Sequence, residues 1–188
     1  MENEPVHQCV IPLHKPSQKE LIFFFASGIL VSIPFAYFFE SLVPAGFSAA
    51  LLIVFFAPFI EELAKVFPLF YRHGETERSI VTLGLLIGLG FGVAEFAEYV
   101  FLGGAPVIGS ISHIIFHASS ATITAYGITK KNPRPYYLLA VALHISINFF
   151  GISGDIILGL FAQLVVLIIA YLLAWSYYHK TSKNKIVV

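Results

Sequence analysis

Two adjacent glutamates and a lysine stand inside a stretch of sequence that is otherwise apolar. Glu61, Glu62 and Lys65 lie in the run AGFSAALLIVFFAPFIEELAKVFPLFY. A helix of this length can cross a bilayer, because about 20 apolar residues are enough. A charged side chain at the centre of a bilayer costs about 2.5–3.5 kcal/mol on insertion scales. Three such side chains in one helix therefore indicate a buried polar site.

Three further apolar runs carry polar groups of the same kind. They are Glu95 and Glu98 in GFGVAEFAEY, His113 and His117 in SHIIFHASS, and His144 and Asn148 in LHISINFF. The helical rise puts most of these groups, with Glu61 and Glu62, at overlapping depths of about 12–22 Å from one face of a membrane. We therefore expect four helices to face one another around a single site.

Carboxylates and imidazoles with an open position are the ligand set of catalytic zinc. On this basis we predict that Glu95, His117 and His144 hold Zn²⁺ or another divalent metal. We expect His113 to lie outside that coordination sphere, as a hydrogen-bond partner between helices. Glu98 is one turn beyond Glu95, and we interpret it as reaching the far interface.

The remaining polar groups suit a hydrolytic reaction. Glu61 is the first choice for a general base acting on water and Glu62 the second, and the sequence leaves both open. Asn148 is predicted to donate to a developing oxyanion or to act as a fourth metal ligand. Lys65 is interpreted as a charge partner, and it shares a helical face with Glu61 because the two are four residues apart.

The composition is that of a membrane protein. Hydrophobic residues make up 57% of the chain and charged residues 12%, whereas soluble chains carry about 25% charged residues. We predict an all-α, multi-pass cell-membrane protein with about six transmembrane helices. Their expected ranges are 21–39, 46–71, 80–102, 107–129, 136–152 and 156–178. The net charge of zero gives no indication of nucleic-acid binding, and Cys9 as the single cysteine excludes an intramolecular disulfide.

The basic residues predict the orientation of the bundle. Apart from Lys65, every Lys and Arg lies before the first span, after the last, or in the connections after spans 2 and 4. The positive-inside rule then puts both termini in the cytoplasm. We expect a cytoplasmic tail at 1–20, a membrane domain at 21–179 with its site in spans 2–5, and a basic cytoplasmic tail at 180–188. The site is expected to open toward the cytoplasmic half.

The same residues resemble the PrsW family of intramembrane metalloproteases, within the wider group of CAAX prenyl endopeptidases and their bacterial relatives. Four motifs occur in order: Glu61-Glu62-x-x-Lys65, Phe91-x-x-x-Glu95 followed by Tyr99, His117 followed by Tyr126-Gly127, and His144-x-x-x-Asn148. The chain departs from the family pattern at Phe96, where Asn is common. The resemblance implies that a membrane-associated protein or peptide substrate is hydrolysed within the bilayer, in some members an anti-sigma factor.

Other functions remain open at this point. Related prenyl endopeptidases have been argued to use glutamate-activated water without a direct metal role. Buried carboxylates, lysine and histidine also mark proton- or cation-coupled transporters, although the sequence shows no inverted repeat or pair of interrupted helices. A catalytically silent membrane chaperone or immunity protein on the same scaffold is a third interpretation. The substrate and the oligomeric state are not indicated by the sequence.

Overall fold

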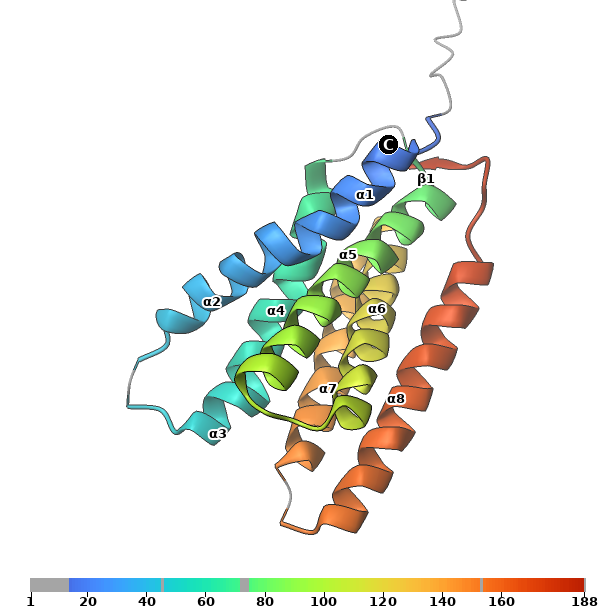
Figure 1. The fold of residues 1–188 in the computed structure, drawn as a ribbon. Coiled ribbons are helices and arrows are strands. Elements are labelled where there is room, and N and C mark those ends of the chain that lie inside the picture. The colour runs from blue at the N-terminus through green and yellow to red at the C-terminus, as the bar shows by residue number, and fades with distance from the viewer. Residues whose placement is uncertain (1–13, 45, 72–74, 153, 188) are drawn as a thin grey trace, which may run out of the picture.

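The computed structural model describes residues 14–44, 46–71, 75–152 and 154–187, and it is almost entirely helical (Figure 1). The tail before His14, with Cys9, and loop residue Arg72 lie outside the described residues. The helical elements are α1 Gln18–Ser27, η1 Gly28–Ser32, α2 Ile33–Ser41, α3 Ala49–Leu51, η2 Leu52–Phe56, α4 Ala57–Val66, η3 Phe67–Tyr71, α5 Glu77–Ala97, η4 Glu98–Leu102, α6 Val107–Thr129, α7 Pro133–Gly151 and α8 Ile156–His179. The strands are β1 Glu75–Thr76 and β2 Ile186–Val187. The predicted all-α fold is confirmed.

Three helices are long and apolar enough to cross a membrane within the described ranges. They are Gln18–Ser41, Glu77–Leu102 and Ile156–His179. Glu95 and Glu98 of the predicted site lie in the second of these, Glu77–Leu102, and the other polar groups of that site lie in the helical ranges between the three. The chain therefore has the features of a membrane protein, and the full set of six spans remains a prediction.

The most extensive helix–helix packing in the bundle joins α5 to α6, and it depends on glycine. A Cβ atom at Gly88 would lie 2.8 Å from the Cβ of Ala121, and one at Gly92 would lie 2.7 Å from the Cα of Ile114. Small residues allow two helix backbones to approach to this degree. The contact brings Glu95, which follows Gly92 by one turn, directly against α6.

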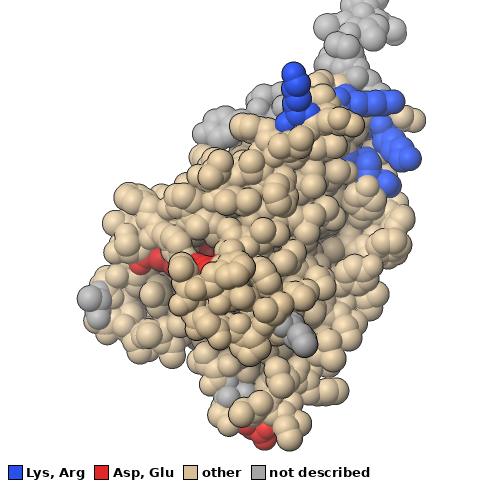
Figure 2. All heavy atoms as spheres, in the orientation of Figure 1, with Lys and Arg blue, Asp and Glu red and all other residues tan. Residues whose placement is uncertain are grey.

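One end of the bundle is closed by ion pairs and a short sheet. β1 pairs antiparallel with β2, so that the C-terminal segment lies over the start of α5. The Glu77 carboxylate accepts from the ammonium groups of Lys130 and Lys185, each at 2.9 Å, and Arg78 donates to Thr181 at 2.6 Å. Figure 2 shows the basic side chains gathered at this end. The described chain ends lie together here, as the segregation of basic residues predicts.

Candidate functional site

The Lys65 ammonium group lies at the centre of a buried polar cluster formed by α4, α6 and α7. Its Nζ donates to Glu62 Oε1 at 2.5 Å, to His117 Nδ1 at 2.8 Å and to Ser120 Oγ at 3.1 Å. An ammonium group has three hydrogens and no acceptor, so these contacts use its whole capacity. Lys65 and Glu62 are both 0% exposed. Lys65 is thus a charge partner, as interpreted from the sequence, and the carboxylate that it pairs with is Glu62, one turn away at i−3.

The contact with Lys65 determines the protonation of His117. Since an ammonium group only donates, His117 Nδ1 must accept, and a neutral imidazole then carries its proton on Nε2. Nε2 keeps this proton and donates a hydrogen bond through it to Glu95 Oε2. Glu95 also accepts from the hydroxyl of Tyr99 at 3.0 Å. His117 thus links the cation of α4 to the carboxylate of α5.

His144 has the opposite arrangement of its two ring nitrogens. Its Nδ1 lies 2.9 Å from Glu62 Oε1, and a carboxylate only accepts, so Nδ1 carries the proton. Nε2 is therefore unprotonated and lies 3.7 Å from Glu61 Oε2. A histidine whose one nitrogen donates to a carboxylate while the other is free has the geometry of a metal ligand or a proton acceptor.

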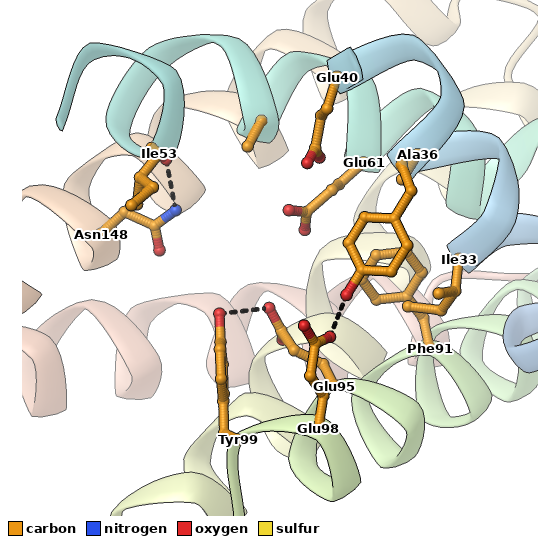
Figure 3. A pocket seen from close by; sticks show the side chains of 12 residues that line it. Ile33, Ala36, Glu40, Ile53, Glu61, Phe91, Glu95, Glu98, Tyr99 and Asn148 are labelled. Carbon is orange, nitrogen blue, oxygen red and sulfur yellow. Dashed lines mark hydrogen bonds between the residues drawn. The ribbon is translucent and has the colours of Figure 1, made fainter. Parts of the chain in front are cut away.

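Glu61 and Glu62 occupy different surroundings, although they are adjacent in sequence. Glu62 is 0% exposed and engaged by Lys65 and His144. Glu61 instead lines a cavity, and its carboxylate points into it (Figure 3). The Glu61 Oε2 atom is buried and has no hydrogen-bond partner among the described residues. The geometry thus separates the two glutamates, which the sequence left equivalent.

The cavity beside Glu61 has a volume of about 130 Å³, which is room for several water molecules. Its lining carries four carboxylates, those of Glu40, Glu61, Glu95 and Glu98. They come from the end of α2, from α4, and from the end of α5 with η4, in the half of the bundle away from the basic end (Figures 1 and 3). The cavity thus lies away from the described chain ends, and the expected opening toward the cytoplasmic half stays a prediction.

An apolar core explains why the cavity does not open toward the basic end. Leu69, Ile80, Leu83 and Tyr126 pack there into one buried cluster, with partly buried Tyr177 against it. These side chains fill the bundle between the polar centre and the basic end. The cavity that Glu61 lines therefore lies on the other side of the polar centre.

Asn148 is held at the cavity by a defect in the helix that precedes α4. The segment η2 is π-helical, and the Ala57 N–H bonds the carbonyl of Leu52, five residues back. The next residue, Pro58, has no N–H and leaves the Ile53 carbonyl without its helical partner. Asn148 Nδ2 donates to that carbonyl at 2.9 Å (Figure 3). The amide group has a second hydrogen that remains available in the cavity.

Three triads among the described residues could hold a metal ion; one, His14, Glu20 and Glu75, lies near the chain ends, and the other two share His117. One consists of Glu61, His117 and His144, and the other of Glu95, His113 and His117, with ligand atoms within 4.8 Å of one another in each. The predicted ligands Glu95, His117 and His144 are thus divided between the two triads. His113, which was expected to lie outside, is in the second, with Nδ1 3.3 Å from Glu95 Oε2.

The buried unpartnered oxygen of Glu61 opposite His144 Nε2 fits a divalent cation. His117 fits less well in the protonation state that Lys65 imposes, because its Nε2 proton occupies the position that a metal would take. The site therefore has one histidine arranged for metal and one arranged for hydrogen bonding.

Sequence reasoning missed two residues at the mouth of the cavity, Tyr37 and Glu40. Both line it, and the Tyr37 hydroxyl donates to Glu98 (Figure 3). The first predicted span carries no ionisable group at its centre, and Glu40 stands just after its last apolar residue. No sequence signal points to these two residues, because only the packing of α2 against α4 brings them to the cavity. Glu98 was expected at the far interface and instead lines the cavity.

The chain matches no protein-family model, no curated protein and no solved structure. The resemblance to the PrsW family thus rests on the four motifs alone.

Replacing Lys65 by Met is expected to destabilise the fold, because it leaves the Glu62 carboxylate buried without its cation. Breaking a buried pair costs about 3–5 kcal/mol. Denaturant unfolding in detergent, followed by circular dichroism, measures this loss. Adding Glu62→Gln should recover part of it, since the uncompensated charge is then removed. Lys19→Met is the control, because this lysine is exposed. An equal effect of both single substitutions, or no recovery in the double variant, would contradict the central role of the Lys65–Glu62 pair.

Proposed function

We propose that the protein is an intramembrane peptidase that hydrolyses peptide bonds of membrane-associated protein or peptide substrates. The observation that carries this proposal is the position of the Glu61 carboxylate. It lines a cavity with room for several water molecules, and its buried Oε2 has no hydrogen-bond partner among the described residues. A carboxylate in this state is arranged to accept a proton from water. The four sequence motifs that resemble the PrsW family contribute the residues around it.

The chain's own residues supply the acid–base steps. Glu61 takes a proton from a water molecule in the cavity as the water oxygen attacks the scissile carbonyl carbon. The second amide hydrogen of Asn148 donates to the oxyanion that forms. Glu61 then returns the proton to the leaving amine nitrogen as the carbon–nitrogen bond breaks. Glu62 and Lys65 do not meet the substrate, and they hold His144 and His117 in their orientations.

A divalent cation, with Zn²⁺ as first choice, is part of the proposal. His144, His117 and Glu95 would hold it, as predicted from the sequence, which leaves Glu61 as the base; His117 would first have to lose its Nε2 proton, which now points to Glu95. When bound, it would polarise the substrate carbonyl and lower the pKa of a bound water. The variant in which glutamate activates water without metal uses the same Glu61 and Asn148.

We also infer that the bundle spans the cell membrane six times with both termini in the cytoplasm. The basic residues gather at the end where the described chain ends lie (Figure 2). The helices α4, α6 and α7 lie among the three long apolar helices and are less apolar because they carry the polar centre. This is the expected property of spans that enclose a polar site.

Replacing Glu61 by Gln keeps the size of the side chain and removes the base. General acid–base assistance is worth about 10²–10⁴ in rate, so cleavage of a reporter membrane peptide in liposomes should fall by that factor. Unfolding in detergent should be unchanged, in contrast to Glu62→Gln, which disturbs Lys65. Asp155→Asn, which removes a carboxylate outside the cavity, is the control and should retain full activity.

Full cleavage by the Glu61→Gln variant would rule out Glu61 as the base. Absence of cleavage by the native chain, together with a proton or cation flux that Glu61→Gln alters, would favour the transporter. Metal content of the same preparations tests the cation: His144→Ala should lose it, and undiminished metal in that variant would exclude His144 as a ligand.

The six-span topology is tested most sharply at α7, which is not among the three long apolar helices. Single cysteines at Arg134 and Gly154, in a Cys9→Ser background, flank the two ends of this helix. Both positions are exposed, and a Cβ at Gly154 meets nothing within 4 Å. A membrane-impermeant maleimide added to intact cells should label Gly154→Cys and spare Arg134→Cys. Labelling of both from outside would exclude the six-span arrangement.

A further inference from the structure

The cavity at the proposed reacting centre is strongly asymmetric in charge. Glu40, Glu61, Glu95 and Glu98 line it, and among the described residues no Lys or Arg does. The nearby cation, Lys65, is fully buried and uses its hydrogens on Glu62, His117 and Ser120. Figure 2 shows acidic atoms in a hollow on this face, away from the basic end.

The carboxylates of the cavity differ in how far they are already neutralised. Glu95 accepts from Tyr99, His113 and His117. The Glu40 carboxylate has no hydrogen bond or ion pair with any described residue, and the Glu98 carboxylate accepts only from the neutral hydroxyl of Tyr37. The buried Glu61 Oε2, which also lines the cavity, has no hydrogen-bond partner among the described residues. Several carboxyl groups thus converge on one space whose described lining holds no Lys or Arg, and this favours a bound cation.

A second cavity, of about 370 Å³, adjoins the first and shares Tyr99 and Asn148 with it. It lies between the start of α6, the end of α7 and α8. Its lining includes Ile147, Leu160 and Leu164 and no carboxylate from the described residues. A peptide that crosses Asn148 would therefore meet carboxylates on one side. On the other side it would meet Ile147, Leu160 and Leu164 beside the uncharged or imidazole side chains of Ser110, Ser112, His113 and Gln163.

We propose that the preferred substrate carries a Lys or Arg side chain on one side of the scissile bond and an apolar side chain on the other. The cationic group enters the cavity of Glu40 and Glu98, and the apolar side chain enters the cavity of Leu160 and Leu164. Tyr37 is a positioning residue that orients the Glu98 carboxylate. This proposal rests on the proposed function, because it names the substrate class of the same site.

The test measures binding and cleavage of N-acetylated reporter peptides that differ at one position beside the scissile bond, Lys against norleucine. Binding is followed by fluorescence anisotropy and cleavage by mass spectrometry, both in the same liposomes, so that any lipid cation affects both peptides equally. A hydrogen bond to a charged group favours the Lys peptide by about tenfold or more. The Glu40→Gln, Glu98→Gln double variant should lose this preference, both in binding and in the ratio of the two cleavage rates. Asp155→Asn should keep the preference.

The outcomes separate the two proposals. Cleavage of both peptides without a preference overturns the substrate assignment and leaves the peptidase intact. Charge-selective binding that the double variant loses, without cleavage, supports the cation site and overturns the peptidase. Equal binding of both peptides to native and variant protein overturns the cation site whatever the cleavage. A Glu98→Lys variant that now prefers a Glu-bearing peptide would support direct contact, which a merely structural role of Glu98 does not produce.

Discussion

A buried ammonium group can only donate hydrogen bonds, and this constraint at Lys65 orders the polar centre of the bundle. Its three hydrogens go to Glu62, His117 and Ser120. Glu62 is thereby held as a carboxylate, and it in turn accepts from His144. The two histidines, whose ring centroids lie 5.2 Å apart, thus receive opposite protonation patterns from one lysine. A Met at position 65 would remove the donor to His117 and the cation beside the Glu62 carboxylate, and with them the cause of both patterns.

Packing and backbone geometry put this network in place. The glycine stripe of α5 lets α6 approach until Glu95 meets His117. Pro58 leaves the Ile53 carbonyl free, and Asn148 of α7 bonds to it. Each device costs local helix stability, because glycine and proline are poor helix residues. Together these two features hold polar side chains from several helices around one small cavity. The proposed hydrolysis needs this arrangement.

The sequence predicts those features of the structure that follow from the pattern of apolar and charged residues along the chain. Apolar runs predict the helices, the loop lysines and arginines predict the basic end, and the rare charges inside the runs predict that α4, α5, α6 and α7 meet. Details that depend on side-chain direction were not predictable. Spacing placed Lys65 beside Glu61, whereas the side chain turns to Glu62 and α6. Nothing in the sequence shows that α2 brings Glu40 and Tyr37 to the same cavity, or that an apolar core closes the basic half.

The most direct test of this account is the location of the protons on His117 and His144. Solid-state NMR of protein in liposomes at neutral pH, with ¹⁵N-labelled histidine rings, distinguishes protonated from unprotonated ring nitrogens. His117→Gln and His144→Gln variants assign the two signals among the 7 histidines. The account predicts an unprotonated Nδ1 and protonated Nε2 for His117, and the reverse for His144. A proton on His117 Nδ1 would contradict it, because that nitrogen could not then accept from the Lys65 ammonium.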